Sequence, residues 1–568
     1  MAAAVNLVVN DAWTCDGDSV RAQQQSGRDI FILSGEATRA TPLMVVCKLS
    51  LPPRPSNAVF GQGLHVHFEA RSSRDQRVET AIFQSAYPYA ESLNDSVHTG
   101  AQWKSFDLDC IAPCDGKQLS LRLRPESKPF EFRDVTVTPV ALSDLGIDAK
   151  LLANPEANIE KARKRAVTVV VLNKQGKPVA NSSVRLKQVG QDFLFGTQIQ
   201  GLDPHRQTAE QKEYQARLRE LFNFATVTPY WPQVESKSGE QNLQKFDEQV
   251  RWLDEAGLST KIHPLFWPHF VPSFLPQNPL KALQQADQHA VSLIKHFAAT
   301  PHLRFIENNE IVAAMTDRSD NGLISWVRRI GPAAAIEHEE QLDKRALHEA
   351  NRSDVTVIYN DYANNTYETD VLAQLARDAA LPDAIGIQMH MTQGNWPLAR
   401  VQFILNRLAR FGKPLYVTEI SVLSGEPRVG EEAGAETSKP WNSKPQGEIE
   451  QAVYVEKLYR LLFSNRCLHG ITWWDLSDKN SWQGAPRGLL REDMTVKPAY
   501  DALRNLICKQ WRTDVSGQSD SSGRFSANVF TGVYEITAQD QYGHTVCKRL
   551  QIPAARATCE VQLRLNGS

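Results

Sequence analysis

Between residues 193 and 476 the sequence alternates eight times between a short apolar run and an amphipathic segment with helical spacing. The apolar runs cover residues 193–199, 224–230, 259–267, 303–310, 355–362, 384–390, 414–420 and 470–476. Nearly continuous apolar strands that alternate with helices are typical of a parallel sheet covered on both faces. Eight such units within about 320 residues predict a (β/α)8 barrel, the TIM-barrel architecture.

The helical segments between these runs have regular apolar faces and defined ends. One carries Leu243, Phe246, Val250 and Leu253 on one face and ends at Gly257; another carries Val401, Ile404, Leu405 and Leu408 and ends at Gly412. An open, doubly wound sheet is the alternative fold. The segment after the first run, FGTQIQGLDP, lacks the GxGxxG pattern with which such sheets bind phosphate, and this favours the barrel.

Both flanks of the barrel are rich in short β-like runs. Residues 1–145 predict a β-sandwich, and residues 146–163 predict a charged, helical connector. Two strand-like runs in residues 164–189 are too few to be stable alone in water. We therefore expect residues 164–189 and 512–568 to form one small β-sandwich into which the barrel, residues 190–511, is inserted. The alternative is that each piece packs separately on the barrel.

The charge balance argues against several classes of partner. The chain has 63 Lys and Arg against 65 Asp and Glu, a formal net charge of −2. A nucleic acid or an anionic membrane surface is therefore not expected as a partner, and no run reaches the length of about 18 apolar residues that a spanning helix needs. The first residues show no basic stretch followed by an apolar one, so no secretion signal is visible. Oligomeric state cannot be deduced from the sequence.

Polar and aromatic residues end seven of the eight apolar runs, which is where a barrel of this type carries its chemistry. They are Tyr230 and Trp231, His263 and Trp267, Asn309 and Glu310, Asn360 and Asp361, Gln388 and His390, Glu419, and Trp474 and Asp475. Glu310 and Glu419 end the fourth and seventh strands, on opposite sides of a ring of eight, so their side chains can converge. Two carboxyl groups among Trp, His, Asn and Gln predict glycoside hydrolysis, whereas one such glutamate alone is more often structural.

Several separated motifs in residues 190–510 resemble glycoside hydrolase family 10, the retaining β-xylanase family. ENNEIV resembles the family's acid/base motif, which implies that Glu310 is the acid/base and that Asn309 contacts the sugar 2-hydroxyl. YVTEI resembles the nucleophile strand and implies Glu419 as nucleophile. IGIQMH resembles a strand on which His390 would orient the nucleophile and Gln388 would contact it or the sugar.

Other motifs of the resemblance concern substrate binding. KIHPLFW implies sugar contacts by His263 and Trp267, and GITWWDLSDKNSWQG followed by KPAYDAL implies Trp474 and Trp482 over the cleft. Asn360, at the end of its strand, is a further candidate for substrate binding. The family typically carries Thr-Pro-Glu-Asn-x-x-Lys after the second strand, but this chain has TPYWPQV. Tyr230 and Trp231 are therefore expected to replace a charged sugar grip by an aromatic one.

The resemblance implies cleavage of β-linked polysaccharide, most simply the β-1,4-xylan backbone, by double displacement without a metal or organic cofactor. The two carboxyl groups are then expected about 5–5.5 Å apart. Activity on another β-glycan is one alternative, and a glycan-binding protein without turnover is another. A metal-dependent hydrolase using His263, His390 and Asp361 or Asp475 is a further one.

The resemblance also bears on the N-terminal sandwich and on location. That sandwich loosely resembles carbohydrate-binding modules, although a purely structural role is equally open. Secretion or a place at the cell surface is expected from the family resemblance.

Overall fold

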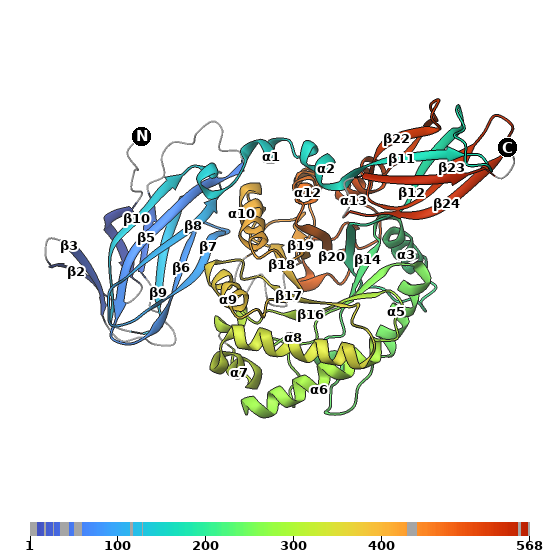
Figure 1. The fold of residues 1–568 in the computed structure, drawn as a ribbon. Helices are drawn as coiled ribbons and strands as arrows, with labels where there is room; N and C mark the ends of the chain where they lie inside the picture. Colours follow the sequence, from blue (N-terminus) through green and yellow to red (C-terminus); the bar gives the residue numbers. More distant parts are fainter. Residues whose placement is uncertain are drawn as a thin grey trace.

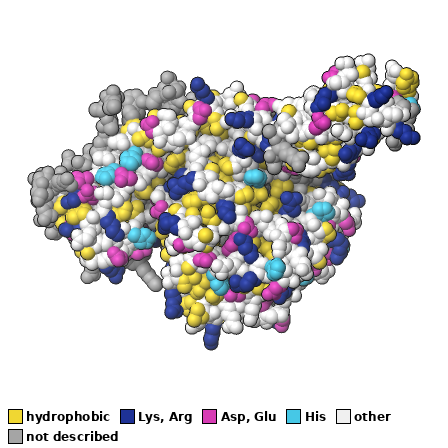
Figure 2. Space-filling view, viewed as in Figure 1, with side chains coloured by type: hydrophobic (Ala, Val, Ile, Leu, Met, Phe, Trp, Pro, Cys, Tyr) yellow, Lys and Arg dark blue, Asp and Glu magenta, His cyan; other side chains and the backbone are white. Residues whose placement is uncertain are grey.

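The computed structural model describes residues 8–15, 19–25, 28–34, 45–49, 60–113, 118–127, 129–317, 319–428, 440–554 and 558–565. A central barrel lies between two β-sandwiches, one from the N-terminal part of the chain and one that includes its C-terminal part (Figure 1). Acidic and basic side chains are interspersed over the face shown in Figure 2, as the near-zero net charge leads one to expect. No helix among the described residues has the length and apolarity needed to span a membrane.

Eight parallel strands close into a barrel in the order of the sequence, which confirms the predicted fold. The strands are β13 (Leu194–Gln198), β14 (Phe224–Val227), β15 (Ser259–Ile262), β16 (Leu303–Asn309), β17 (Thr356–Asp361), β18 (Ala384–Met391), β19 (Leu415–Val422) and β20 (Leu468–Asp475). The main surrounding helices are α3 (Ala209–Leu221), α5 (Gln244–Ala256), α6 (Pro279–Phe297), α7 (Gly322–Ile330), α8 (Pro332–Glu349), α9 (Thr366–Arg377), α10 (Leu398–Ala409), α12 (Pro445–Ser464) and α13 (Pro498–Asn505). Shorter helical turns are α4 (Trp231–Val234), η3 (Ala313–Met315), η4 (Trp482–Gly484) and η5 (Leu506–Gln510).

The interior of the barrel has an apolar end and a polar end. At the amino ends of the strands a separate cluster of buried apolar side chains fills the space, namely Leu194, Phe224, Phe305, Ile358 and Ala384. Polar side chains take over toward the carboxyl ends, where Lys261, Glu307 and Asn360 are buried. The apolar layer closes one end of the barrel, so the polar groups face the other end, where the βα loops begin.

The N-terminal sandwich consists of two five-stranded sheets, with strand orders β1-β4-β9-β6-β7 and β2-β3-β10-β5-β8. The strands are β1 (Val8–Cys15), β2 (Ser19–Gln25), β3 (Arg28–Ser34), β4 (Val45–Leu49), β5 (Gln62–Ser72), β6 (Gln76–Gln84), β7 (Glu91–Thr99), β8 (Lys104–Ala112), β9 (Leu119–Pro125) and β10 (Phe130–Val140). Alternate residues face one apolar core between the sheets, including Phe68, Leu121 and Phe132.

The sandwich is fixed to the barrel through helix α9. Asp95 on β7 is fully buried and accepts hydrogen bonds from the backbone N–H groups of Thr366 and Tyr367, at 2.7 and 3.2 Å. These N–H groups belong to the first turn of α9 and have no partner within the helix, so a carboxylate from another domain adds to the helix's own cap, Asn365. Arg400 on α10 adds a hydrogen bond of 2.6 Å to the carbonyl oxygen of Glu91.

A helical connector, η2 (Leu142–Leu145), α1 (Ala149–Ala153) and α2 (Glu156–Arg163), leads to the second sandwich. Its sheets have the orders β22-β11-β25 and β21-β12-β23-β24. The strands are β11 (Lys164–Leu172), β12 (Ser183–Gln191), β21 (Asp514–Gln518), β22 (Arg524–Phe530), β23 (Gly532–Gln539), β24 (Thr545–Ile552) and β25 (Thr558–Arg564). Strands from both sides of the barrel sequence thus pair in one sandwich, while the predicted domain limits themselves stay predictions.

Replacing Asp95 with alanine should weaken the attachment of the sandwich to the barrel. The change leaves the partly buried N–H groups of Thr366 and Tyr367 without an acceptor, which should cost roughly 1–2 kcal/mol, while Asn365 still caps the N–H of Glu368. Calorimetric melting of the full chain should show a lower melting temperature. Asp107→Ala is the matched control, because Asp107 lies on β8 of the same sandwich and, among the described residues, its side chain bonds only to His65 and His67. Equal losses in both variants would contradict the capping role.

Candidate active site

Glu419 near the end of β19 is almost fully buried, with 3% of its surface exposed. Its Oε1 accepts a hydrogen bond from the side-chain nitrogen of Asn360 at 3.1 Å, and its Oε2 lies 2.8 Å from His390 Nε2. Burial raises the pKa of Glu419 to about 7, although the nearby charge of His263 acts to lower it. The site therefore holds a carboxyl group that titrates near neutral pH.

His390 is the orienting partner of that carboxyl group. Burial, together with the positive charge of Arg487, lowers the pKa of His390 to about 3, so the ring is neutral. A carboxylate only accepts, so the single ring proton lies on Nε2 and is donated to Glu419. Nδ1 then accepts from the hydroxyl of Ser421 at 2.9 Å, and Arg487 donates to the same hydroxyl oxygen at 3.3 Å.

Glu310 follows β16 in a conformation that non-glycine residues rarely adopt, with φ at +59°. Its backbone N–H donates to the carbonyl oxygen of Asn360 at 2.8 Å, which holds this turn. Its carboxyl group accepts from Trp267 Nε1 at 2.6 Å and from Gln388 Nε2 at 3.0 Å. Burial raises the pKa of Glu310 and the charge of Glu419 adds to that rise, whereas His269, with its Nε2 3.9 Å from the carboxyl group, opposes it. Strained backbone of this kind is common at catalytic positions.

One chain of amide groups joins the two carboxyl groups. Asn360 donates to Glu419 and, at 2.8 Å, to the side-chain oxygen of Asn309. Gln388 donates to the same oxygen and to Glu310, both at 3.0 Å. The structure thus brings together five of the residues that the sequence singled out, in one buried network.

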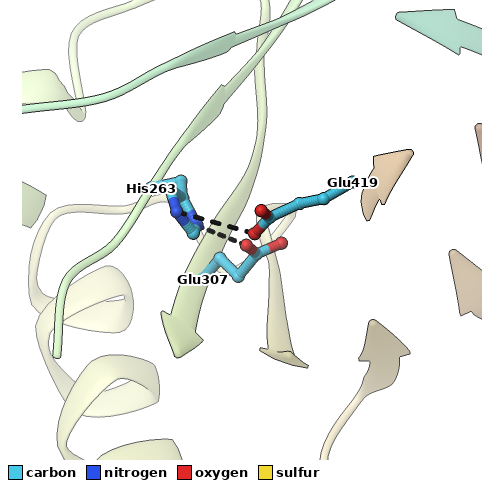
Figure 3. A group of neighbouring side chains, drawn as sticks. All are labelled: His263, Glu307 and Glu419. Atoms are coloured by element: carbon cyan, nitrogen blue, oxygen red, sulfur yellow. Dashed lines mark hydrogen bonds and ion pairs between the residues drawn. The ribbon is translucent and has the colours of Figure 1, made fainter. Parts of the chain in front are cut away.

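A second set of buried charges lies beneath Glu419. Figure 3 shows His263 pointing toward two carboxyl groups, with its Nδ1 2.5 Å from Glu307 and its Nε2 3.8 Å from Glu419. Lys261 completes the set with a bond of 2.5 Å to Glu307. Burial alone would raise the pKa of Glu307. The charges of Lys261 and His263 outweigh burial, so the pKa of Glu307 is lowered. This ion pair fixes the ring of His263 beside Glu419.

Aromatic rings surround the carboxyl groups on two sides. Trp267 packs against Tyr230 and Phe270, with ring centroids 5.5 and 5.6 Å apart. Across the site Trp474 is buried and meets His263 edge-on at 5.4 Å, whereas Trp482 is 40% exposed and lies 4.8 Å from His390. Trp482 thus offers an accessible ring to a ligand, while Trp474 packs behind the histidines.

Trp231 does not join this group. Its ring is buried and stacks on His289 at 4.6 Å, and its Nε1 donates to Glu235 at 3.0 Å. The two aromatic residues that the sequence proposed as a sugar grip therefore separate. Tyr230 faces the site beside Trp267, and Trp231 packs toward α6.

The metal-ligand set considered from the sequence is not assembled among the described residues. Asp361 accepts from the backbone N–H groups of Val312 and Ala313, and Asp475 accepts from that of Trp482 at 3.1 Å. Both aspartates therefore hold loops. His263, Glu307 and Glu419 are spaced closely enough to hold a cation, but the Lys261 ammonium already neutralises Glu307 there. A second group with such spacing, on α6 and α8, lies away from this site.

The sequence interpretation missed Lys261, Glu307 and Ser421. Each lies two positions from a residue that it did select, namely His263, Asn309 and Glu419. Because side chains two apart on a strand share a face, the same alternation that turned the selected residues inward also turned these inward. The alternation of side-chain direction along each strand, which repeats every two residues, was therefore the sequence signal that could have identified them.

Comparison with known proteins places this barrel among characterised families. The family model for glycosyl hydrolase family 10 matches residues 186–506, more than half of the 568-residue chain. One curated relative is the anti-sigma-I factor RsgI6 of Acetivibrio thermocellus, 22% identical over 400 residues that cover 68% of this chain and 47% of the relative. The chain thus spans about half the length of that relative.

Two further relatives carry xylanase names. Endo-1,4-beta-xylanase B of Thermotoga neapolitana is 22% identical over 293 residues, covering 49% of this chain and 78% of the relative. The solved structure of xylanase 10B from Thermotoga petrophila RKU-1 in complex with xylobiose is 21% identical, covers 56% of this chain and 95% of its own, and has a TM-score of 0.46.

Replacing Glu419 with glutamine should stabilise the fold in a pH-dependent way. The folded pKa of about 7 lies above the ordinary value of 4.5, so the wild type loses stability as pH rises from about 4.5 to 7, while neutral glutamine escapes that loss. The free energy of unfolding of the variant, relative to that of the wild type, should increase by roughly 2–3 kcal/mol between pH 5 and pH 8. Melting temperatures of both proteins at the two pH values check this. The exposed Glu426→Gln is the control. A pH-independent difference for Glu419→Gln would contradict this reading of the site.

Proposed function

This chain belongs to glycosyl hydrolase family 10, and on that premise we propose that it cleaves the backbone of a β-linked polysaccharide, β-1,4-xylan first, with retention of configuration. The proposal rests on one observation above all. Glu310 and Glu419 are both buried at one end of the barrel and joined by a single chain of amide donors. The names of the xylanase relatives support xylan as the substrate.

In the proposed first step the carboxylate of Glu419 attacks the anomeric carbon. Glu310, whose pKa is raised by burial and by the charge of Glu419, gives its proton to the leaving oxygen. The bond from the anomeric carbon to that oxygen breaks, and a glycosyl ester of Glu419 forms. His390 and Asn360 hold the attacking carboxylate in place through their hydrogen bonds.

In the proposed second step Glu310 acts as a base. It takes a proton from a water molecule, whose oxygen attacks the anomeric carbon and releases Glu419. Two inversions give net retention, which requires the carboxyl groups to lie about 5–5.5 Å apart, and that spacing stays a prediction.

Sugar recognition is proposed for the groups around the two glutamates. Asn309 accepts two hydrogen bonds through its oxygen, so its amide nitrogen is the group to donate to a sugar hydroxyl. The exposed ring of Trp482 provides a stacking face. Tyr230, packed with Trp267 and Phe270, supplies aromatic surface where the resemblance leads one to expect charge. Aromatic surface in place of charge favours activity on another β-glycan as the second candidate function.

For the N-terminal sandwich we propose a role in binding the leaving-group side of the substrate. A cavity of about 390 Å³ lies between the sandwich and the barrel. Asn94 and Ser96 of β7 line one wall, and His390 and Tyr362 of the barrel line another. The segment that follows Glu310, including Val312, also lines it. Because Glu310 is the proposed proton donor to the leaving group, the departing saccharide is expected on this side.

Azide can distinguish the roles of the two glutamates. Glu419→Ala should lower kcat/KM on xylan by roughly 10⁴-fold or more, because the covalent step is lost. With an aryl β-xylobioside and azide it should form the α-glycosyl azide by direct displacement. Glu310→Ala should keep attack on an activated aryl leaving group and give the β-glycosyl azide. Swapped products would reverse the assignment, and Glu426→Ala should match the wild type.

A panel of β-linked polysaccharides tests the substrate. Reducing ends released from xylan, and abolished by Glu419→Ala, are the expected result. Release only from another β-glycan would support the shifted preference, and Tyr230→Ala should then lower activity on that glycan. Binding without release from any member of the panel would overturn the catalytic proposal in favour of a glycan-binding protein.

The contribution of the sandwich is tested by Asn94→Ala. The side chain of Asn94 is exposed at the cavity, and within the described part of the chain it bonds only to Glu91, at 2.9 Å, so its loss should not unfold the sandwich. KM for xylohexaose should rise roughly threefold or more, in proportion to one lost hydrogen bond, with no change for an aryl xylobioside. Asp107→Ala on β8, outside the cavity lining, is the control. An unchanged KM for the long substrate would contradict the proposed role.

A further inference from the structure

Helices α6 and α8 pack side by side on the outside of the barrel and share a cluster of ionisable groups (Figure 1). His338 on α8 places its Nε2 3.2 Å from both carboxylate oxygens of Asp287 on α6. Glu339 follows His338 in the chain. One potential ligand atom from each of these three residues lies within 4.8 Å of the other two. The cluster therefore has the spacing of a first coordination sphere around a small cation.

Glu339 is the unusual member of the cluster. None of its surface is exposed, and neither of its carboxylate oxygens has a hydrogen-bond partner in the described structure. One turn further along α8, Asp343 is equally buried, and of its two oxygens only Oδ2 is bonded, to the amide of Asn308 at 2.7 Å. An isolated buried carboxylate is strongly unfavourable, so Glu339 must be neutralised by a proton or by a cation.

The protein cation nearest along α8 is already engaged. Lys344 pairs with Glu340 at 2.9 Å and with Asp383 at 2.7 Å. His338 faces Asp287, and its ring forms a T-shaped contact with the ring of Trp326, with centroids 5.4 Å apart. The space between Asp287, His338 and Glu339 is thus bordered by two carboxylates and one imidazole, with Asp343 behind them.

We propose that Asp287, His338 and Glu339 bind a divalent transition-metal ion, with Zn²⁺ as the best fit. One imidazole nitrogen and two carboxylate oxygens are a common zinc donor set, whereas Ca²⁺ and Mg²⁺ prefer oxygen ligands alone. A water molecule can complete the tetrahedron from the solvent side, because the side chains of Asp287 and His338 remain 25% and 33% exposed. Glu339 supplies the buried ligand.

The proposed ion has a structural consequence for the barrel. It joins α6 to α8, and α8 in turn holds β16 through the hydrogen bond from Asn308 to Asp343. Asn308 directly precedes Asn309 and Glu310 in the chain. Zinc at this position therefore stabilises the outer support of the strand that leads to the candidate acid/base, without touching the reacting groups.

Zinc binding is measured on the full chain after treatment with EDTA and removal of the chelator. Titration with ZnCl2 should load one ion at this site, seen by calorimetry and by elemental analysis after desalting. The melting temperature should rise by roughly 3 °C or more at saturating zinc. Co²⁺ in place of Zn²⁺ should give the visible absorption of a tetrahedral ion. Absence of any tightly bound zinc would overturn the proposal.

Glu339→Gln separates the two ways of neutralising Glu339. Glutamine resembles a protonated glutamate, so a merely protonated Glu339 predicts unchanged stability and unchanged zinc loading. The metal site predicts loss of the zinc-dependent rise in melting temperature in Glu339→Gln and in His338→Ala. Glu337→Gln, on the same helix outside the cluster, should behave as the wild type. Equal zinc loading in Glu339→Gln and the wild type would overturn the assignment.

The active site contains histidines and carboxylates that could bind zinc independently. The titration is therefore repeated in the Glu419→Ala background, where the proposed site must still load one ion. If xylan hydrolysis fails but zinc binding follows Glu339, the metal site stands and the proposed function falls. If hydrolysis succeeds and zinc loading is the same with and without Glu339, the proposed function stands and the metal site falls.

Discussion

Two carboxyl groups can stay buried at the mouth of a barrel only when hydrogen-bond donors replace the water they lose. Here the donors to Glu310 and Glu419 are Asn360, Gln388, His390 and Trp267. They come from β17, β18 and the segment after β15, so their relative positions depend on closure of the barrel. The apolar layer at the opposite end, with Phe224 and Phe305, excludes water and holds the strands together. The two buried carboxyl groups are therefore stable only because the closed barrel brings their hydrogen-bond donors together.

The barrel could be predicted from the sequence because each of its units repeats the same apolar strand and amphipathic helix, and eight repeats leave few alternatives. The polar strand ends were also visible, since a polar residue that ends an apolar run stands out. Lys261 and Glu307 were not visible in this way, because they lie inside the runs and are tolerated only by pairing with each other. Pairing between strands is a tertiary property, and a single run does not reveal it. Trp231 illustrates a second limit of prediction from sequence. It was selected together with its neighbour Tyr230, but only Tyr230 faces the site, because adjacent residues on a turn can point in different directions.

The N-terminal sandwich was predictable as a class but not in its attachment. Its strand β7, with the sequence ESLNDSVHT, has no clear apolar alternation and does not stand out as a strand in the sequence. Its polar residues serve the barrel rather than the sandwich core, because Asp95 caps α9 and Asn94 borders the shared cavity. A strand selected for contact with another domain does not show the pattern of one selected for its own core. The same feature makes the sandwich part of the candidate cleft wall instead of a separate appendage.

The surroundings of the two glutamates also bear on which of them carries the proton. Burial raises the pKa of both groups, so they compete for one negative charge. Glu419 has His263 and Lys261 nearby, both of which favour its ionised form, against the opposing charge of Glu307. Glu310 lies close to a further buried carboxyl group, Asp361, whose pKa is raised to about 6 by burial and by the charge of Glu310 itself. Repulsion between neighbours is reciprocal, so ionising Glu310 is opposed by Asp361 as well as by Glu419. His269 favours the ionised form of Glu310 in turn, because its Nε2 lies 3.9 Å from the Glu310 carboxyl group. The two glutamates therefore share one negative charge in the resting site, and the proposed first step requires that charge on Glu419 and the proton on Glu310.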